Sequence, residues 1–313
     1  MTQVINPIPP GGTGHLGLQA VARIGFGGHQ LVREITRDAA LMVLRRAVEL
    51  GVNHIDTASY YNGGEVNRRI RTALAPRGSS YPDGLVIVSK VGASYTGGHP
   101  IPVIPAQKPA ELRAAVETDL RQLGLETVPV VNLRRYELGP ATAPTGDQNV
   151  DLDDQLAEMI ALRDEGKIGA IGISSVPLDV LRRAVPAGIV CVQNAYSLLD
   201  RAQQDALDYC AQEGIAWVPY FPLGSAFPRI PKVTDNPTVR EIAHELHVTP
   251  AQIGLAWLLT TSANTLLIPG TGSLAHLQDN VAAGDIVLSD DARGRLDAVT
   301  ARGDGPDYAS LRR

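Results

Sequence analysis

One pattern recurs along this chain of 313 residues: a helical segment ends at a glycine, and a short, almost wholly apolar run follows. Gly51, Gly166, Gly188 and Gly214 each occupy this place. A glycine just beyond a helix takes the left-handed conformation that ends the helix. A strand that is apolar at nearly every position suits a sheet covered on both faces, as parallel sheets are. The pattern therefore predicts strands and helices that alternate around a parallel sheet.

We expect eight strands, each followed by helical sequence. The strands are predicted near residues 22–26, 52–56, 85–90, 128–133, 168–173, 189–193, 215–219 and 265–269. Helices are predicted after Thr36, between Pro109 and Gly124, and near 65–76, 151–165, 177–185, 201–213, 237–247, 250–260 and 273–283. Eight such units in about 280 residues fit a closed (β/α)8 TIM barrel. An open doubly wound sheet would favour a G-x-G-x-x-G turn after the first strand, and Gly25–Gly28 lacks that spacing.

The whole chain, 1–313, is predicted to be a single α/β barrel domain, with residues 1–20 as an N-terminal extension or cap and 301–313 as a C-terminal tail. Barrels of this kind reach roughly 250 residues or more as one unit. The segments 91–108, 134–150 and 223–236 are long loops between a strand and the following helix. Because active sites of such barrels lie at the carboxyl ends of the strands, these loops are expected to shape the substrate pocket.

The composition excludes several classes of protein. Lys and Arg total 28 and Asp and Glu total 33, a net charge of −5 without a basic stripe, so no nucleic-acid partner is expected. No apolar stretch approaches the roughly 18 residues of a membrane span. The two cysteines, Cys191 and Cys210, make no disulfide framework, which favours the cytoplasm. No metal site is expected, and the oligomeric state is left open.

Polar residues at the strand ends point to chemistry. Asp56 ends the second predicted strand and Lys90, one of four lysines, ends the third, so the two side chains could pair. Tyr61 follows Asp56 by five residues. A cation near a phenol lowers its pKa from about 10, which would suit Tyr61 to act as a general acid near neutral pH. A structural Asp–Lys pair with Tyr61 packed beside it explains the spacing equally well.

A second candidate site lies near the end of the chain. The strand that ends at Ile268–Pro269 leads into Gly270-Thr271-Gly272-Ser273 and then into a helix. The free N–H groups of a helix N-terminus bind anions, and barrels often hold a phosphate after strands seven and eight. A helix that is merely capped by Ser273 is the more common arrangement, so both interpretations stay open.

Taken together, these residues resemble the aldo-keto reductase superfamily over roughly residues 20–300. The motifs are Ile55-Asp56-Thr57-Ala58 with Tyr61, Val88-Ser89-Lys90-Val91, Gly172-Ile173-Ser174-Ser175, Val192-Gln193-Asn194, Tyr220 with Pro222-Leu223-Gly224, and Ile268-Pro269-Gly270-Thr271 through Asn280. The resemblance implies hydride transfer between NADPH and an aldehyde or ketone. It also implies that Tyr61 donates the proton, that Lys90 and Asp56 tune its pKa, and that Tyr220 stacks on the nicotinamide, with Ser174 and Gln193 holding the carboxamide.

The cofactor-binding residues that the resemblance implies are Gly27, Ser174, Ser175, Gln193, Tyr220, Pro222, Leu223, Gly224, Ser225, Ile268, Gly270, Thr271, Ser273, His276, Asp279 and Asn280. This set departs from the family pattern in two respects. Asn is usual where Ser175 stands, so the carboxamide site would lose one amide partner. Gly270 and His276 stand where the family often has Lys or Arg around the 2′-phosphate, so NADPH is expected first and NADH is not excluded.

A third departure is Arg134, which stands where the family usually has His. Arg cannot lose its proton, so it acts only as a charged donor. It could orient the carbonyl oxygen, stabilise developing charge, or bind an anionic substrate group. The segment Asn132-Leu133-Arg134 is similar to the branch that includes pyridoxal reductase, which implies a small aldehyde such as pyridoxal. By strand alternation Arg134 and Arg135 diverge, so only one faces the pocket.

Two other functions fit parts of the sequence. Without the family's His, the chain could be a cofactor-binding barrel that senses or serves as a subunit without turnover. A Schiff-base aldolase would use Lys90 as its nucleophile, but Tyr61 and Asn280 would then have no role. The reductase accounts for more of the motifs than either alternative.

Overall fold

The computed structural model describes residues 9–33, 35–77, 79–97, 103–138, 144–224 and 230–301. Parallel pairing joins seven strands into one curled sheet in the order β11–β10–β9–β8–β5–β4–β3. In chain order they are β3 (Phe26–Gly27), β4 (His54–Asp56), β5 (Val86–Val91), β8 (Val128–Arg134), β9 (Ile168–Ser174), β10 (Ile189–Gln193) and β11 (Ala216–Trp217). Each matches one of the predicted strands to within a few residues.

The predicted eighth strand closes the barrel through single bridges instead of forming a regular strand. Thr265 pairs in parallel with Trp217 on one edge of the sheet, and Leu267 pairs in parallel with Ile24 on the other. The Leu267 N–H donates to the Arg23 carbonyl at 2.7 Å. Pro269 lacks an N–H and cannot donate to the neighbouring strand, so the pairing there is reduced to its carbonyl, which accepts from the Gly27 N–H at 3.4 Å. The predicted (β/α)8 architecture is thus present, with its last strand shorter than expected.

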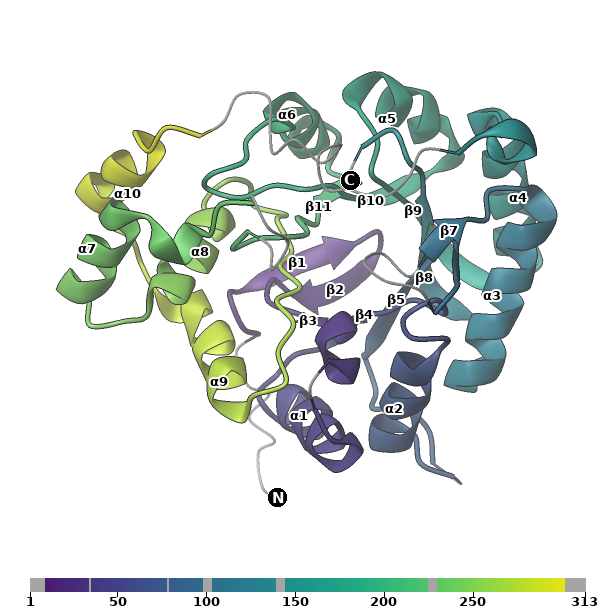
Figure 1. Ribbon diagram of the computed structural model, residues 1–313, viewed down its shortest axis with the longest axis horizontal. Helices are drawn as coiled ribbons and strands as arrows, with labels where there is room; N and C mark the ends of the chain where they lie inside the picture. Colours follow the sequence, from purple (N-terminus) through teal and green to yellow (C-terminus); the bar gives the residue numbers. More distant parts are fainter. Residues whose placement is uncertain are drawn as a thin grey trace.

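Helices surround the strands (Figure 1). They are α1 (Arg37–Glu49), α2 (Glu65–Leu74), α3 (Pro109–Leu123), α4 (Leu152–Asp164), α5 (Leu178–Ala184), α6 (Gln204–Glu213), α7 (Pro237–Glu245), α8 (Pro250–Leu259), α9 (Leu274–Ala282) and α10 (Asp290–Asp297). Thr36 caps α1 by accepting a hydrogen bond from the Ala39 N–H, and Gly124 ends α3 at a φ of 69°. Both boundaries follow from the residue types.

Two hairpins and one helix were not predicted. The antiparallel hairpin of β1 (Thr13–Leu16) and β2 (Gln19–Ala22) lies across the centre of the barrel in Figure 1. Leu16 and Val21 pack there against interior side chains such as Val88 and Val130. Much of this hairpin falls within residues 1–20, the segment predicted to be an N-terminal extension or cap. Helix α10 buries only Ala292 and Leu296, so its sequence carries little apolar periodicity.

The long loops contain some structure. The segment 91–108, expected as a loop, holds a hairpin of β6 (Ala93–Tyr95) and β7 (Val103–Pro105). Parts of the three predicted loops, at 98–102, 139–143 and 225–229, and most of the predicted tail, 302–313, lie outside the described residues. In the part of the chain that the structure describes, no helix is long and apolar enough to cross a membrane.

Candidate active site

Lys90 and Asp56 form the predicted pair at the carboxyl ends of β5 and β4. The Lys90 Nζ donates to Asp56 Oδ1 at 2.5 Å and to the Thr57 carbonyl at 2.9 Å. The two residues are 6% and 3% exposed. Burial of a charge is costly unless it is paired, so each side chain requires the other. For Lys90 to act as a Schiff-base nucleophile, it would first have to leave both partners.

Gln193 completes the hydrogen bonding of Asp56. Its Nε2 donates to Asp56 Oδ2 at 2.7 Å from the end of β10. The sequence predicted that Gln193 binds the cofactor, and in the structure its amide nitrogen is already bonded to Asp56. The amide orientation is therefore fixed, with the oxygen of Gln193 left as an acceptor.

Tyr61 lies directly beside this pair. The Lys90 Nζ is 4.9 Å from the centroid of the Tyr61 ring, and the rings of His29 and Tyr60 meet it edge-on at 4.9 and 5.3 Å. Burial, and then the charge of Asp56, raise the pKa of Tyr61 well above its ordinary value, while Arg134 acts to lower it. The expected lowering of this pKa is wrong, because burial and the charge of Asp56 raise it. Tyr61 thus keeps its proton at neutral pH.

Arg134, at the end of β8, is the cation that favours ionisation of Tyr61. Its Nη1 donates to the Tyr136 hydroxyl at 3.0 Å, and its Cζ lies 4.5 Å from the centre of the Tyr136 ring. Burial lowers the pKa of Arg134, but four neighbouring tyrosines outweigh it and the pKa is raised. These are Tyr60, Tyr136, Tyr220 and Tyr61. Within the described ranges no carboxylate forms an ion pair with Arg134.

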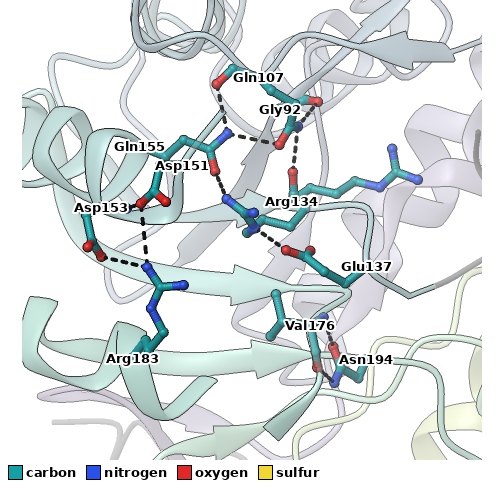
Figure 2. Close-up of polar contacts among 11 residues, drawn as sticks. Gly92, Gln107, Arg134, Glu137, Asp151, Asp153, Gln155, Val176, Arg183 and Asn194 are labelled. Atoms are coloured by element: carbon teal, nitrogen blue, oxygen red, sulfur yellow. Dashed lines mark hydrogen bonds and ion pairs between the residues drawn. The ribbon is translucent and has the colours of Figure 1, made fainter. Parts of the chain in front are cut away.

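A cluster of glutamine side chains fixes the backbone of Arg134 on the side opposite its guanidinium group. Gln107 Nε2 donates to the Arg134 carbonyl at 3.0 Å and to the Gly92 carbonyl, and Gln155 in turn donates to Gln107 (Figure 2). The guanidinium group of Arg134 extends away from this cluster. Arg135 points the other way, since its guanidinium donates to Gln155. The predicted divergence of the two arginines is confirmed.

The predicted nicotinamide residues form a chain of hydroxyl groups. The Ser174 and Ser175 oxygens lie 3.4 Å apart, and the Ser175 oxygen lies 3.3 Å from the Tyr220 hydroxyl. Hydrogen bonds this long are weak, so these groups keep capacity for a ligand. Ser175 has a φ of 63°, a left-handed conformation that Asn adopts far more readily than most residues. The usual Asn at this position thus has a backbone reason as well as a binding one.

The predicted phosphate end is also brought together. A Cβ on Gly27 would lie 2.5 Å from the Ile268 carbonyl, and one on Gly270 would lie 2.5 Å from the Gly27 carbonyl, so only glycine fits at both places. Ser273 caps α9 by accepting from the His276 N–H. The Thr271 hydroxyl accepts from the Ser273 N–H at 3.0 Å.

The remaining predicted residues line the rim. His276 is exposed, Asp279 is half-buried and Asn280 is buried on α9. Pro222, Leu223 and Gly224 are half-buried after Tyr220, and Gly224 has a φ of 84°. Ser225 lies outside the described residues. A cofactor that reached from Ser174 to Ser273 would therefore pass along the carboxyl ends of β9, β10, β11 and the segment 265–269, which closes the barrel.

Sequence reasoning missed three residues that support the site: Tyr136, Gln107 and Asp119. Tyr136 lies two residues beyond Arg134, a spacing that could have suggested a contact on the same side of the chain. Gln107 and Asp119 act from a loop and a helix distant in sequence, and their spacing carries no signal. Both are polar residues in buried positions, which only the fold reveals.

The comparison with protein families decides the assignment. The model of the aldo/keto reductase family matches residues 23–301. The chain belongs to the aldo/keto reductase family. The residues matched by the family model include Asp56, Tyr61 and Lys90, as well as the segment 265–269 and helix α9.

Relatives of this aldo/keto reductase cover nearly the whole chain. Pyridoxine 4-dehydrogenase of Escherichia coli (strain K12) is 40% identical over 292 residues, which are 91% of this chain and 97% of that protein. The crystal structure of an aldo-keto reductase from Klebsiella pneumoniae in complex with NADPH has a TM-score of 0.77 at 27% identity, covering 94% of this chain and 98% of that one. A second Klebsiella pneumoniae structure, with NADP and acetate, has a TM-score of 0.75, the same identity, and coverage of 94% and 96%.

These findings confirm several predictions. The protein is an NADP(H)-dependent oxidoreductase of the aldo/keto reductase family, acts on small-molecule carbonyl compounds and has the predicted barrel. The resemblance to the pyridoxal reductase branch agrees with the pyridoxine 4-dehydrogenase relative. The residues predicted to hold the carboxamide fit that group, because their weakly bonded hydroxyls and one oriented amide offer the donors and acceptors that a carboxamide needs.

Proposed function

We propose that this aldo/keto reductase reduces a pyridoxal-like aldehyde with NADPH, using Tyr61 as the proton donor. The observation that carries the proposal is that Tyr61 lies beside the Lys90–Asp56 pair and that the charge of Arg134 acts on its phenol. Bound NADPH supplies the hydride. The proton and the stabilisation of the developing charge come from side chains of the protein.

Tyr61 holds a proton that it gives to the carbonyl oxygen. Its raised pKa keeps the phenol protonated before the reaction. As the proton leaves, negative charge moves onto the Tyr61 oxygen, where Arg134 favours it and Asp56 opposes it. Lys90 reduces that opposition by pairing with Asp56. Arg134 therefore takes the electrostatic part of the work that the family assigns to a histidine at this place.

Arg134 also supports the choice of substrate. It is a half-buried guanidinium that has tyrosine neighbours and, among the described residues, no carboxylate partner. A guanidinium in such a place favours a ligand with negative charge. Pyridoxal carries an acidic ring hydroxyl beside its aldehyde, so one molecule offers both a carbonyl for Tyr61 and an anion for Arg134. The name of the pyridoxine 4-dehydrogenase relative agrees with this substrate class.

The test is NADPH consumption with a panel of aldehydes that includes pyridoxal. Turnover of pyridoxal with formation of the matching alcohol supports the proposal. Tight NADPH binding without turnover of any carbonyl would instead favour a sensor or subunit. Trapping of a substrate adduct on Lys90 by borohydride would favour the aldolase.

Arg134→Gln is expected to change substrate preference. Activity (kcat/KM) with pyridoxal and with 2-hydroxybenzaldehyde should fall about 10- to 100-fold, the size of a lost hydrogen bond to a charged group. Benzaldehyde and 2-methoxybenzaldehyde have no acidic hydroxyl, so their activity should fall much less. An equal loss for all four aldehydes would contradict a role in substrate selection and leave only the effect on Tyr61.

Ser175→Asn is expected to tighten NADPH binding. The left-handed backbone at this position accommodates Asn, and the amide restores the missing carboxamide partner. One neutral hydrogen bond is worth roughly a two- to tenfold decrease in Kd, which fluorescence titration with NADPH measures. Ser175→Ala removes the hydroxyl without adding an amide, so it should weaken binding. Weaker binding by the Asn variant would place the carboxamide elsewhere.

We also propose a cytoplasmic location. Both described cysteines, Cys191 and Cys210, are buried as free thiols, a state that a reducing compartment preserves.

A further inference from the structure

A buried carboxylate lies behind the proposed proton-donor site. Asp119, on α3, is 0% exposed. Its Oδ1 accepts from Asn67 Nδ2 of α2 at 2.7 Å, and its Oδ2 accepts from the Ser89 hydroxyl of β5 at 2.7 Å. In the described residues Asp119 forms no ion pair, although the charge of Lys90 acts on it from a distance. An unpaired carboxylate at full burial is costly, so its presence needs a reason.

The hydrogen-bond partners of Asp119 connect it to the strand that carries Lys90 and to the carbonyl that accepts from the Lys90 ammonium group. Ser89 directly precedes Lys90 on β5, so its bond to Asp119 holds the strand that carries the lysine. Asn67 Oδ1 accepts from the Thr57 hydroxyl at 2.6 Å, and the Thr57 carbonyl accepts from Lys90 Nζ at 2.9 Å. One carboxylate thus ties together the base of the lysine and the carbonyl that receives its ammonium group.

The same carboxylate reaches the segment that leads to Tyr61. The Ser59 side chain also favours the ionised form of Asp119, because it acts to lower the pKa of that carboxyl group. Ser59 stands two residues before Tyr61, in the turn that follows β4. Helices α2 and α3 therefore hold the strand end, the lysine and the tyrosine segment through a single group.

We propose that Asp119 is a positioning residue, which holds Lys90 and the Thr57–Ser59 segment so that Tyr61 stays in place to deliver its proton. This inference rests on the proposed role of Tyr61 and goes beyond it, because Asp119 touches none of the reacting groups. A positioning residue of this kind is worth more to the rate than to the fold, since small displacements of reacting groups are costly.

The titration of Asp119 agrees with a role other than stability. Burial raises the pKa of Asp119 to about 7, against the opposing hydrogen bonds from Ser89, Asn67 and Ser59 and the charge of Lys90. An unfolded aspartate has a pKa of about 3.9, so between roughly pH 4 and 7 the folded chain binds more protons than the unfolded one. Folding stability therefore falls as the pH rises through this window. The ionised carboxylate is a cost to the fold at neutral pH.

Asp119→Asn tests the proposal, because the amide has the same shape and mimics the protonated acid at every pH. In the unsubstituted enzyme, kcat should fall as the pH drops through about 7, since protonated Asp119 loses an acceptor for Ser89 or Asn67. The variant should show a kcat about tenfold lower above pH 7 and no titration there, with the Kd for NADPH within about twofold. Its melting temperature at pH 8 should equal or exceed that of the parent.

Two further variants keep the result interpretable. Ser89→Ala removes one of the two hydrogen bonds without changing charge, so it should also lower kcat and leave the Kd for NADPH unchanged. Asp154→Asn changes an exposed aspartate of α4 in the same way and should match the parent in every measurement. A parental kcat and pH profile in Asp119→Asn would overturn the proposal. That outcome leaves the reductase activity itself intact, whereas failure of the proposed function would appear as no turnover of any aldehyde by the unsubstituted enzyme.

Discussion

Tyr61→Phe should abolish aldehyde reduction while leaving NADPH binding intact. The phenylalanine ring keeps the edge-on contacts with His29 and Tyr60, so the packing of the site is preserved. The change removes the only atom of Tyr61 that carries a transferable proton. Positioned proton donors contribute about 10²- to 10⁴-fold to rates, and kcat should fall by at least that lower figure. NADPH titration of the same preparation checks that the cofactor still binds.

Tyr60 provides the matched control, because its phenol is buried next to Tyr61 and faces the same arginine. The pKa of Tyr60 is also raised by burial, and its ring lies 5.3 Å from that of Tyr61. Tyr60→Phe should therefore lose far less activity than Tyr61→Phe. The reverse order would make Tyr60 the proton donor, and full activity in both variants would refute proton donation by either of these tyrosines.

The sequence predicts most of the barrel because its signals are local. Gly124 ends α3 and Thr36 begins α1 as expected, since capping depends on a few adjacent residues. The strand near 265–269 is shorter than expected because Pro269 has no N–H to donate and because its pairing partners, Ile24 and Trp217, are distant in sequence. The hairpin of β1 and β2 carries too little apolar pattern to be recognised, and its packing inside the barrel is a tertiary property.

The candidate site shows the same division. Asp56, Lys90 and Tyr61 could be named from their spacing, because the strand ends of a parallel barrel meet at one face. The direction in which the Tyr61 pKa shifts could not be predicted from the spacing, because burial and Asp56 oppose the effect that a lysine alone would have. Asp119 is the strongest case: nothing near it in the sequence marks it, and its role depends on three elements that meet only in the fold.

Lys90→Met should have the largest effect on stability. The substitution leaves Asp56 buried with Gln193 as a partner but without a compensating cation. Breaking a buried ion pair from one side costs about 3–5 kcal/mol of unfolding free energy, because the remaining charge stays desolvated. Turnover should be lost as well, since uncompensated Asp56 opposes ionisation of Tyr61. Chemical denaturation, followed by tryptophan fluorescence, measures the change in stability.

The double variant Lys90→Met with Asp56→Asn separates charge from packing. An asparagine oxygen can still accept from Gln193 and leaves no charge behind, so the double variant should recover most of the lost stability and none of the lost activity. Lys167→Met is the matched control at the surface, where the lysine pairs with Glu117 and Glu165 in solvent and should cost far less. A double variant as unstable as the single one would mean that Lys90 acts through the packing of its chain. Its role would then be structural, and the tuning of Tyr61 would fall to Arg134.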